Sequence, residues 1–145
     1  MIRLHSGMRA VRHERLVLVF TMAQIDELHG RLGRAETLAD YVRGLAALGV
    51  VRFDSFLVDG HSEFFSADGR RVVSAPHHEA LTVAETSDQA AFLEHLQRHR
   101  DKETSYVEMS VRLAASGVEK WVVDTAALTM TYRDRAGVSL LVEKV

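Results

Sequence analysis

Apolar and polar positions recur along the chain with a period that changes from about 3.6 to about 2 residues, which separates predicted helices from predicted strands. In the first half, apolar residues at helical spacing are followed by Gly33 and Gly49, both natural helix stops. Alternating residues come next, interrupted by the turn signals Asp59-Gly60 and Asp68-Gly69. The sequence therefore predicts helices over about 22–32 and 37–48, and strands near 51–57, 61–65 and 70–75.

The second half shows the same order of patterns. After Pro76, a short strand or extended link at 81–85 leads to a helix that Ser87 or Asp88 caps. The pattern then predicts two helices and three strands, over about 87–100, 105–117, 118–125, 128–133 and 138–145.

The two halves align without a gap at an offset of 117 − 49 = 68 residues. Matched positions include Gly49 and Gly117, Leu45 and Leu113, Phe53 and Trp121, Phe64 and Tyr132, and Gly69 and Gly137. Helix ends, aromatic residues and turn glycines share one register, which favours an internal duplication of a helix-helix-three-strand unit. The expected fold is α+β, with helices packed on antiparallel sheet. The pattern leaves open whether the copies share one six-stranded sheet or pair about a pseudo-two-fold axis.

The expected organisation is a tail followed by one domain. Residues 1–18 carry four arginines before a short apolar run, which is typical of a mobile N-terminal tail. A signal peptide is disfavoured because the apolar run is short and no small-residue cleavage site follows it. Residues 19–145 are predicted to form a single domain of two repeats, at about 22–75 and 87–145.

Composition narrows the function classes. With 18 basic and 20 acidic residues, the formal net charge is −2, so no nucleic-acid partner is expected. The chain has no cysteine, which excludes thiolate chemistry and favours a cytoplasmic location. No apolar run approaches the length of a membrane span, so no membrane partner is expected.

The segment Asp59-Gly60-His61-Ser62-Glu63 is the most suggestive candidate for chemistry. On a strand, His61 and Glu63 share a face, where an imidazole and a carboxylate bind a metal or act as a base pair. A hairpin turn followed by a solvated strand is the simpler alternative and is favoured. The matching segment of the second half, 127–131, is apolar or neutral, so the fold does not demand the polar residues.

A second candidate, His77-His78-Glu79, lies in the link between the copies. Loops on a rigid scaffold often carry function, although a polar connector is the favoured alternative. We expect His61, Glu63 and at least one of His77 or His78 to line a common concavity. The full set of candidate ligand-binding residues is Asp59, His61, Glu63, His77, His78 and Glu79.

Two further features favour structural roles. His95 and His99 are one helical turn apart, a spacing that suits zinc, but no glutamate of the zinc-protease motif lies between them. Arg98 and Arg100 flank the pair, so a solvated helix face is the preferred interpretation. Trp121 matches an aromatic residue of the other copy, which favours core packing.

The chain also resembles a known family. The motifs that carry the resemblance are Val58-Asp59-Gly60-His61-Ser62-Glu63-Phe64-Phe65, Ser116-Gly117-Val118-Glu119-Lys120-Trp121, Tyr132-Arg133-Asp134-Arg135-Ala136-Gly137 and Leu141-Val142-Glu143-Lys144. Together they resemble the YbcV-like proteins, small bacterial proteins of unknown function sometimes labelled phage envelope protein. The resemblance covers about 20–145 and implies a cytoplasmic α+β domain, without implying an activity or a catalytic residue. Residues up to about 18 have no counterpart in it.

These observations favour a non-enzymatic ligand-binding or protein-interaction module. The alternative is a small enzyme or metal-binding protein that uses the His/Glu cluster. The sequence identifies no cofactor, and the partner is an unknown small molecule or protein. An oligomer is compatible with the sequence.

Overall fold

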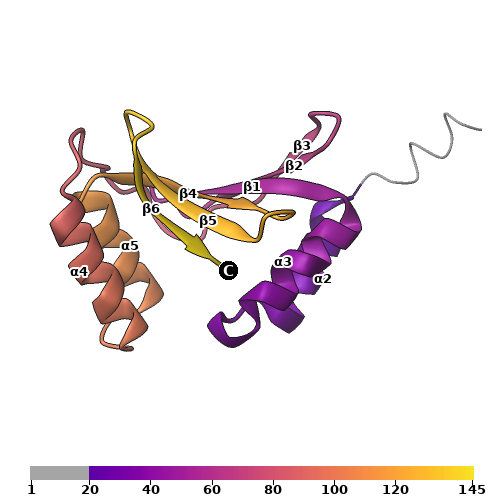
Figure 1. The fold of residues 1–145 in the computed structure, drawn as a ribbon, viewed down its shortest axis with the longest axis horizontal. Coiled ribbons are helices and arrows are strands. Elements are labelled where there is room, and N and C mark those ends of the chain that lie inside the picture. The colour runs from indigo at the N-terminus through magenta and orange to yellow at the C-terminus, as the bar shows by residue number, and fades with distance from the viewer. Residues whose placement is uncertain (1–19) are drawn as a thin grey trace, which may run out of the picture.

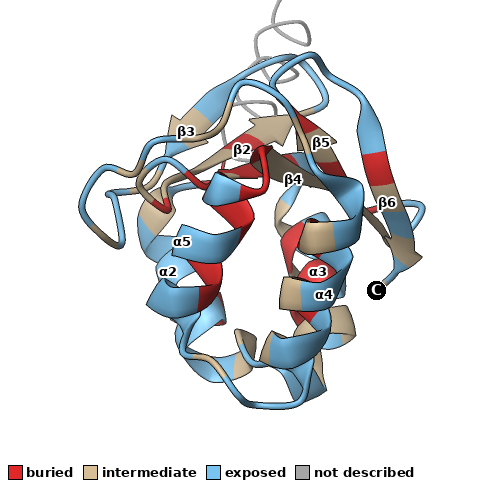
Figure 2. Ribbon diagram, turned by 90° about the vertical axis from the view of Figure 1, so that its left-hand side faces the viewer, coloured by how far each residue is buried: buried red, intermediate tan, exposed pale blue. Residues whose placement is uncertain are grey.

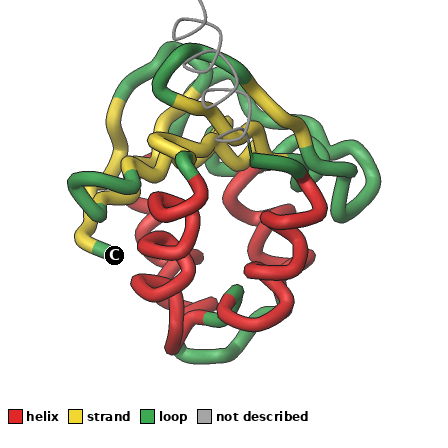
Figure 3. The backbone as a smooth tube through the Cα atoms, turned by 90° about the vertical axis from the view of Figure 1, so that its right-hand side faces the viewer, coloured by secondary structure: helices red, strands yellow, loops and turns green. Residues whose placement is uncertain are grey.

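A computed structural model describes residues 20–145, which form a six-stranded antiparallel sheet with two helix pairs (Figure 1). The helices are α2 (Met22–Leu32), the 3₁₀ helix η1 (Ala35–Thr37), α3 (Leu38–Leu48), α4 (Gln89–Arg100) and α5 (Tyr106–Ala115). The strands are β1 (Val50–Phe56), β2 (Ser62–Ser66), β3 (Arg71–Val73), β4 (Val118–Asp124), β5 (Thr129–Asp134) and β6 (Ser139–Lys144). All four α-helices lie on the same side of the sheet (Figure 3). The expected α+β class is confirmed.

Local signals in the sequence set the ends of the helices. Thr21 and Gln24 form a capping box at the start of α2, and Ser105 and Glu108 form another at the start of α5. Each box satisfies backbone N–H groups that have no partner within the helix. Gly49 ends α3 with φ of 102°, a left-handed conformation that glycine adopts without a steric penalty.

The strand order is β3-β2-β1-β4-β5-β6, so the two halves share one sheet and meet at β1 and β4. Across this junction Arg52 faces Asp124, and Phe56 faces Lys120. Because 52 + 68 = 120 and 124 − 68 = 56, the 68-residue offset converts one pair into the other. The halves are thus related by a pseudo-two-fold rotation. The sequence left open whether the copies share one six-stranded sheet or pair about a pseudo-two-fold axis, and the structure has both features. Descent from one duplicated unit stays a prediction.

The start of β1 departs from simple alternation of buried and exposed side chains. Simple alternation along β1 would bury Val51, but this side chain is 42% exposed while Val50 is 1% exposed. The pairing of β1 with β2 shifts between Val50 and Arg52, which inserts Val51 as a bulge. The equivalent shift occurs in the second half, between Val118 and Lys120.

The interior consists of two hydrophobic clusters, and buried residues gather where each helix pair meets the sheet (Figure 2). The first cluster lies under α2 and α3, and the second under α4 and α5. Each cluster also includes one buried residue of the other half, Val123 of β4 in the first and Leu57, which directly follows β1, in the second. Trp121 and Met130 are only partly buried and pack against both clusters. These two side chains therefore mark the seam between the clusters.

The predicted tail over 1–18 lies outside the described residues. Phe20, the first residue that the structure describes, is 4% exposed and belongs to the first cluster. The extended link at 81–85 contains no strand. No helix within residues 20–145 is long and apolar enough to cross a membrane.

Candidate functional site

A cleft of about 760 Å³ opens along the seam, between the two helix pairs and the helix-covered face of the sheet. Its volume is within the range of about 300–1,000 Å³ that is typical of small-molecule sites. Both halves line it, through α2, α3, β1 and β2 on one side and α4, α5, β4 and β5 on the other. The cleft exists because the two helix pairs cover separate clusters and leave the middle of the sheet between them.

Aromatic side chains from four adjacent strands form the floor of the cleft. Phe64 on β2 pairs with Phe53 on β1, and their ring centroids are 5.3 Å apart. Trp121 on β4 pairs with Tyr132 on β5, with centroids 6.1 Å apart. Burial raises the pKa of Tyr132 to about 12, so its phenol is neutral at physiological pH. The floor is therefore broad, apolar and uncharged.

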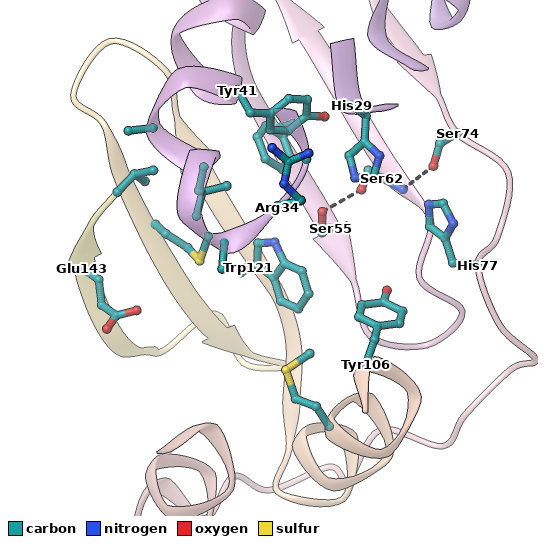
Figure 4. A pocket seen from close by; sticks show the side chains of 18 of the residues that line it. His29, Arg34, Tyr41, Ser55, Ser62, Ser74, His77, Tyr106, Trp121 and Glu143 are labelled. Atoms are coloured by element: carbon teal, nitrogen blue, oxygen red, sulfur yellow. Dashed lines mark hydrogen bonds between the residues drawn. The ribbon is translucent and has the colours of Figure 1, made fainter. Parts of the chain in front are cut away.

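Polar groups gather at one end of this floor (Figure 4). The hydroxyls of Ser55 and Ser62 are hydrogen-bonded at 2.6 Å, and the backbone N–H of Ser62 donates to Ser74 Oγ at 2.8 Å. His77 and Tyr106 border the same end, and the indole of Trp121 lies beside it, because Trp121 is the partner of Ser55 across β1 and β4 (Figure 4). This end therefore combines three hydroxyls, an imidazole and a phenol, all of which can form hydrogen bonds.

The second half of the sheet has apolar residues where the first half has this serine pair. Ser55 faces Ser62 across β1 and β2, and Val123 faces Met130 across β4 and β5. The 68-residue offset relates the two pairs, since 55 + 68 = 123 and 62 + 68 = 130. The same strand geometry thus accepts an apolar pair, so packing does not require the hydroxyls.

The predicted cluster of Asp59, His61 and Glu63 is brought together, but not in the wall of the cleft. Asp59 Oδ1 lies 2.5 Å from His61 Nδ1, and Glu63 Oε2 lies 3.2 Å from His61 Nε2. The imidazole also stacks on the ring of Phe56, with centroids 4.6 Å apart. Arg71 Nη1 then donates to the other oxygen of Glu63 at 3.1 Å. The three residues form a fixed ion-pair chain on the hairpin between β1 and β2.

The two carboxylates of this ion-pair chain favour the protonated form of His61. Partial burial opposes the charged imidazole, but hydrogen bonds to Asp59 and Glu63 and their negative charges outweigh burial and raise the pKa of His61. Burial likewise opposes the charged carboxylate of Asp59, but hydrogen bonds from the backbone and ring of His61 lower the pKa of Asp59. A protonated imidazole bonded at both nitrogens has no lone pair with which to bind a metal or accept a proton.

The segment around His77 and His78, which follows the first half of the sheet, connects the ion-pair chain to the cleft. The backbone N–H groups of His77 and His78 both donate to the carbonyl of Asp59, at 2.9 and 3.1 Å. His77 lines the cleft, whereas the ring of His78 packs near Tyr106 and its Nε2 is buried without a hydrogen-bond partner among residues 20–145. Glu79 is exposed. We expected His61 and Glu63 to line one concavity together with His77 or His78. In the structure His77 lines the cleft, whereas His61 and Glu63 lie outside its lining.

His95 and His99 do not form a pair. His99 lines the cleft and its Nδ1 contacts the carbonyl of Thr104 at 3.1 Å, while His95 Nδ1 is buried without a partner in the described part of the chain. Within residues 20–145, no group of three or more histidine or acidic side chains is arranged to hold a metal ion.

Sequence reasoning missed the residues that define the cleft. Trp121 was expected in the core because its match is Phe53, which is 5% exposed; the indole instead lies partly buried at the seam. The serine pair gave one available signal. At the 68-residue offset, the polar Ser62 matches the apolar Met130. In the same way, the polar Ser55 matches the apolar Val123.

Comparison with known proteins gives a family without a described activity. A family model described as "Protein of unknown function (DUF1398)" matches residues 26–144. The match covers most of the chain, so the chain belongs to this family. A search of curated proteins finds no match.

Proposed function

We propose that this DUF1398 protein is a non-enzymatic module that binds a small organic molecule in the cleft between its helix pairs. One observation carries the proposal: a cleft of about 760 Å³ has an aromatic floor and a few polar groups gathered at one end. This combination of a broad apolar surface and a small number of orienting polar groups is typical of small-molecule sites.

The hydrogen bonds at the polar end support binding rather than catalysis. Nucleophilic catalysis by serine needs a base within hydrogen-bond reach of the hydroxyl. Ser55 and Ser62 instead bond to each other, and Ser74 Oγ donates to the carbonyl of Ala75 at 3.2 Å. The alternative of an enzyme or metal-binding protein built on His61 has less support, because both ring nitrogens already meet carboxylates.

In this proposal the hairpin and the link have a positioning role. The ion-pair chain of Asp59, His61 and Glu63 fixes the turn, and the carbonyl of Asp59 fixes the link that carries His77 into the cleft wall. The absence of cysteine supports a cytoplasmic location for the module. The resemblance to the YbcV-like proteins agrees with this location and adds no activity.

The single tryptophan makes the proposal directly testable, because Trp121 is the only one in the chain and lines the cleft. A panel of small aromatic molecules is titrated while tryptophan emission is recorded. We expect at least some members to change the emission saturably. In calorimetry, Trp121→Leu weakens the binding of those members by about tenfold, since a buried aromatic contact is lost.

Phe65→Leu is the matched control for this variant. Phe65 follows Phe64 on β2, so it points to the opposite face of the sheet, where its ring lies 4.1 Å from the guanidinium carbon of Arg52. This variant should bind the same molecules as the wild type. Equal losses in both variants, or an aromatic panel without any binder, would contradict the proposed function.

A further inference from the structure

We infer that the ligand is an uncharged planar aromatic molecule with a hydrogen-bond-accepting oxygen at one edge. The inference rests on the proposed function and names the class of ligand for the same cleft. Three separate observations carry it: the charge balance of the lining, the position of the indole, and an unused hydroxyl hydrogen in the serine pair.

The lining carries equal numbers of charged side chains of each sign. Three are basic and three are acidic, a net of 3 − 3 = 0: Arg34, Arg100, Lys144, Asp26, Glu36 and Glu143. Arg100 pairs with Glu143, Arg34 lies 3.8 Å from Glu36, and Lys144 donates to a backbone carbonyl. Two of the three basic side chains are thus ion-paired with carboxylates of the lining, so a ligand carboxylate or phosphate would lose its hydration and compete with Glu143 and Glu36 for them. This favours a ligand without charge.

The apolar side of the cleft suits a flat ring. Trp121 packs partly against both clusters, and the part of its indole that the clusters do not cover borders the cleft. Met130, from the neighbouring strand, and Met109, from α5, line the same space. Indole faces stack on aromatic rings, and thioethers make favourable contacts with them. An aromatic ligand would use both kinds of contact.

The serine pair can donate one more hydrogen bond. Its two hydroxyls carry two hydrogens, and the bond between Ser55 and Ser62 uses one of them. Neither hydroxyl donates to a second acceptor among residues 20–145. The remaining hydrogen is thus available to a ligand oxygen beside Trp121, which is the partner of Ser55 across β1 and β4. A carbonyl or ether oxygen at the edge of the ring is the acceptor that this donor selects.

The second half of the protein supplies the variant that tests this step. Replacing the pair with the residues at the equivalent register, Ser55→Val with Ser62→Met, removes both hydroxyls and introduces a pair that the fold already contains in Val123 and Met130. Thr131→Val is the control, because it removes a hydroxyl from β5 outside the cleft lining. Circular dichroism and thermal unfolding establish that each variant is folded. Ser55→Ala with Ser62→Ala is the smaller change should this double variant unfold.

Three probes of matched shape separate the contributions: acetophenone, isopropylbenzene and benzoate. They carry a carbonyl, an apolar branch of the same form and a charged group on one ring. Dissociation constants come from protein-observed NMR titrations of the wild type and the variants. We expect either double serine variant to weaken acetophenone binding about fivefold relative to isopropylbenzene, the effect of one net hydrogen bond. Thr131→Val leaves that ratio unchanged, and benzoate binds more weakly than acetophenone.

The outcomes distinguish the two proposals. If the aromatic probes bind but the serine variants leave the ratio of acetophenone to isopropylbenzene affinity unchanged, or if benzoate binds most tightly, the inferred ligand class is wrong and the cleft remains a binding site. If none of the three probes binds and the aromatic panel leaves Trp121 emission unchanged, the proposed function itself fails.

Discussion

Asp54 and Val122 face each other at the junction of β1 and β4, and their numbers differ by 122 − 54 = 68, the offset that relates the two halves. The pseudo-two-fold rotation therefore exchanges these two positions. Arg52 and Lys120, which are also 68 apart, both bind the single carboxylate: Arg52 Nε lies 3.1 Å from Asp54 Oδ1, and Lys120 Nζ lies 3.2 Å from Asp54 Oδ2. Equivalent cations from both halves thus converge on an acid that only the first half has.

Asp54→Asn is expected to destabilise the fold, because the side chain is only 6% exposed and both cations lose their counter-charge. We expect a loss of about 2 kcal/mol in the free energy of unfolding, less than for a fully buried pair because Arg52 is half exposed. Urea unfolding of the variant and the wild type measures it. Asp40→Asn is the control: Asp40 makes an exposed 3.5 Å pair with Arg43, and its loss costs less than about 1 kcal/mol. Equal effects of the two variants would contradict a structural role for the central carboxylate.

Leu45 and Leu113 test whether the two clusters unfold together. They occupy equivalent positions, since 45 + 68 = 113, and both are 0% exposed. Truncation to alanine at either position should cost about 2–5 kcal/mol. Because Val123 and Leu57 cross between the clusters, we expect each variant to unfold in a single transition. Calorimetry that shows two separate transitions in either variant would mean that the halves fold independently.

Gly60 lies where the hairpin packs against the link. It has φ of +78°, and an added Cβ would lie 3.0 Å from atoms of His77, His78 and Tyr106. Gly69 has φ of +87° but nothing within 4 Å of an added Cβ, so Gly69→Ala measures the backbone strain alone. We expect Gly69→Ala to cost about 1 kcal/mol and Gly60→Ala to cost more, because the link must also shift. Chemical denaturation of both variants checks this, and equal losses would show that the contact at Gly60 is unimportant.

His61 should make stability depend on pH. Its pKa is raised above 6.5 in the folded protein, so its contribution is fully present below about pH 6.5 and is lost as pH rises through the folded-state pKa. Asp59 affects stability at acid pH. Because its pKa is lowered in the folded protein, its contribution to the free energy of unfolding is lost only as pH falls below about 3.8. The wild type should therefore lose stability relative to His61→Gln as pH rises from about 6.5. An NMR titration that places the pKa of His61 at or below 6.5 would contradict the assignment.

Local signals predicted the elements of this fold well. Helix starts at Thr21 and Ser105 and the stop at Gly49 depend on a few neighbouring residues, so the sequence alone carries them. The exposure of Val51 was not predictable from alternation, because a bulge depends on how two strands pair.

The cleft depends on longer-range relationships. The contact of His61 with Glu63 followed from strand periodicity, whereas Asp59 meets His61 through the turn that precedes β2. That periodicity gave no information on which face of the sheet the helices cover, so the separation of His61 from His77 was not foreseen. The position of Trp121 depends on the gap between two clusters, which no single segment encodes.

The most direct test of the account follows the indole N–H resonance of Trp121, the only such resonance in the spectrum because the chain has one tryptophan. During a titration with acetophenone, we predict a saturable shift of this resonance together with the backbone amides of Ser55 and Ser62. The amide of Phe65, whose side chain lies on the opposite face, should change little. Saturable binding that moves the resonances of the opposite face and leaves the indole unchanged would contradict a ligand site in the cleft.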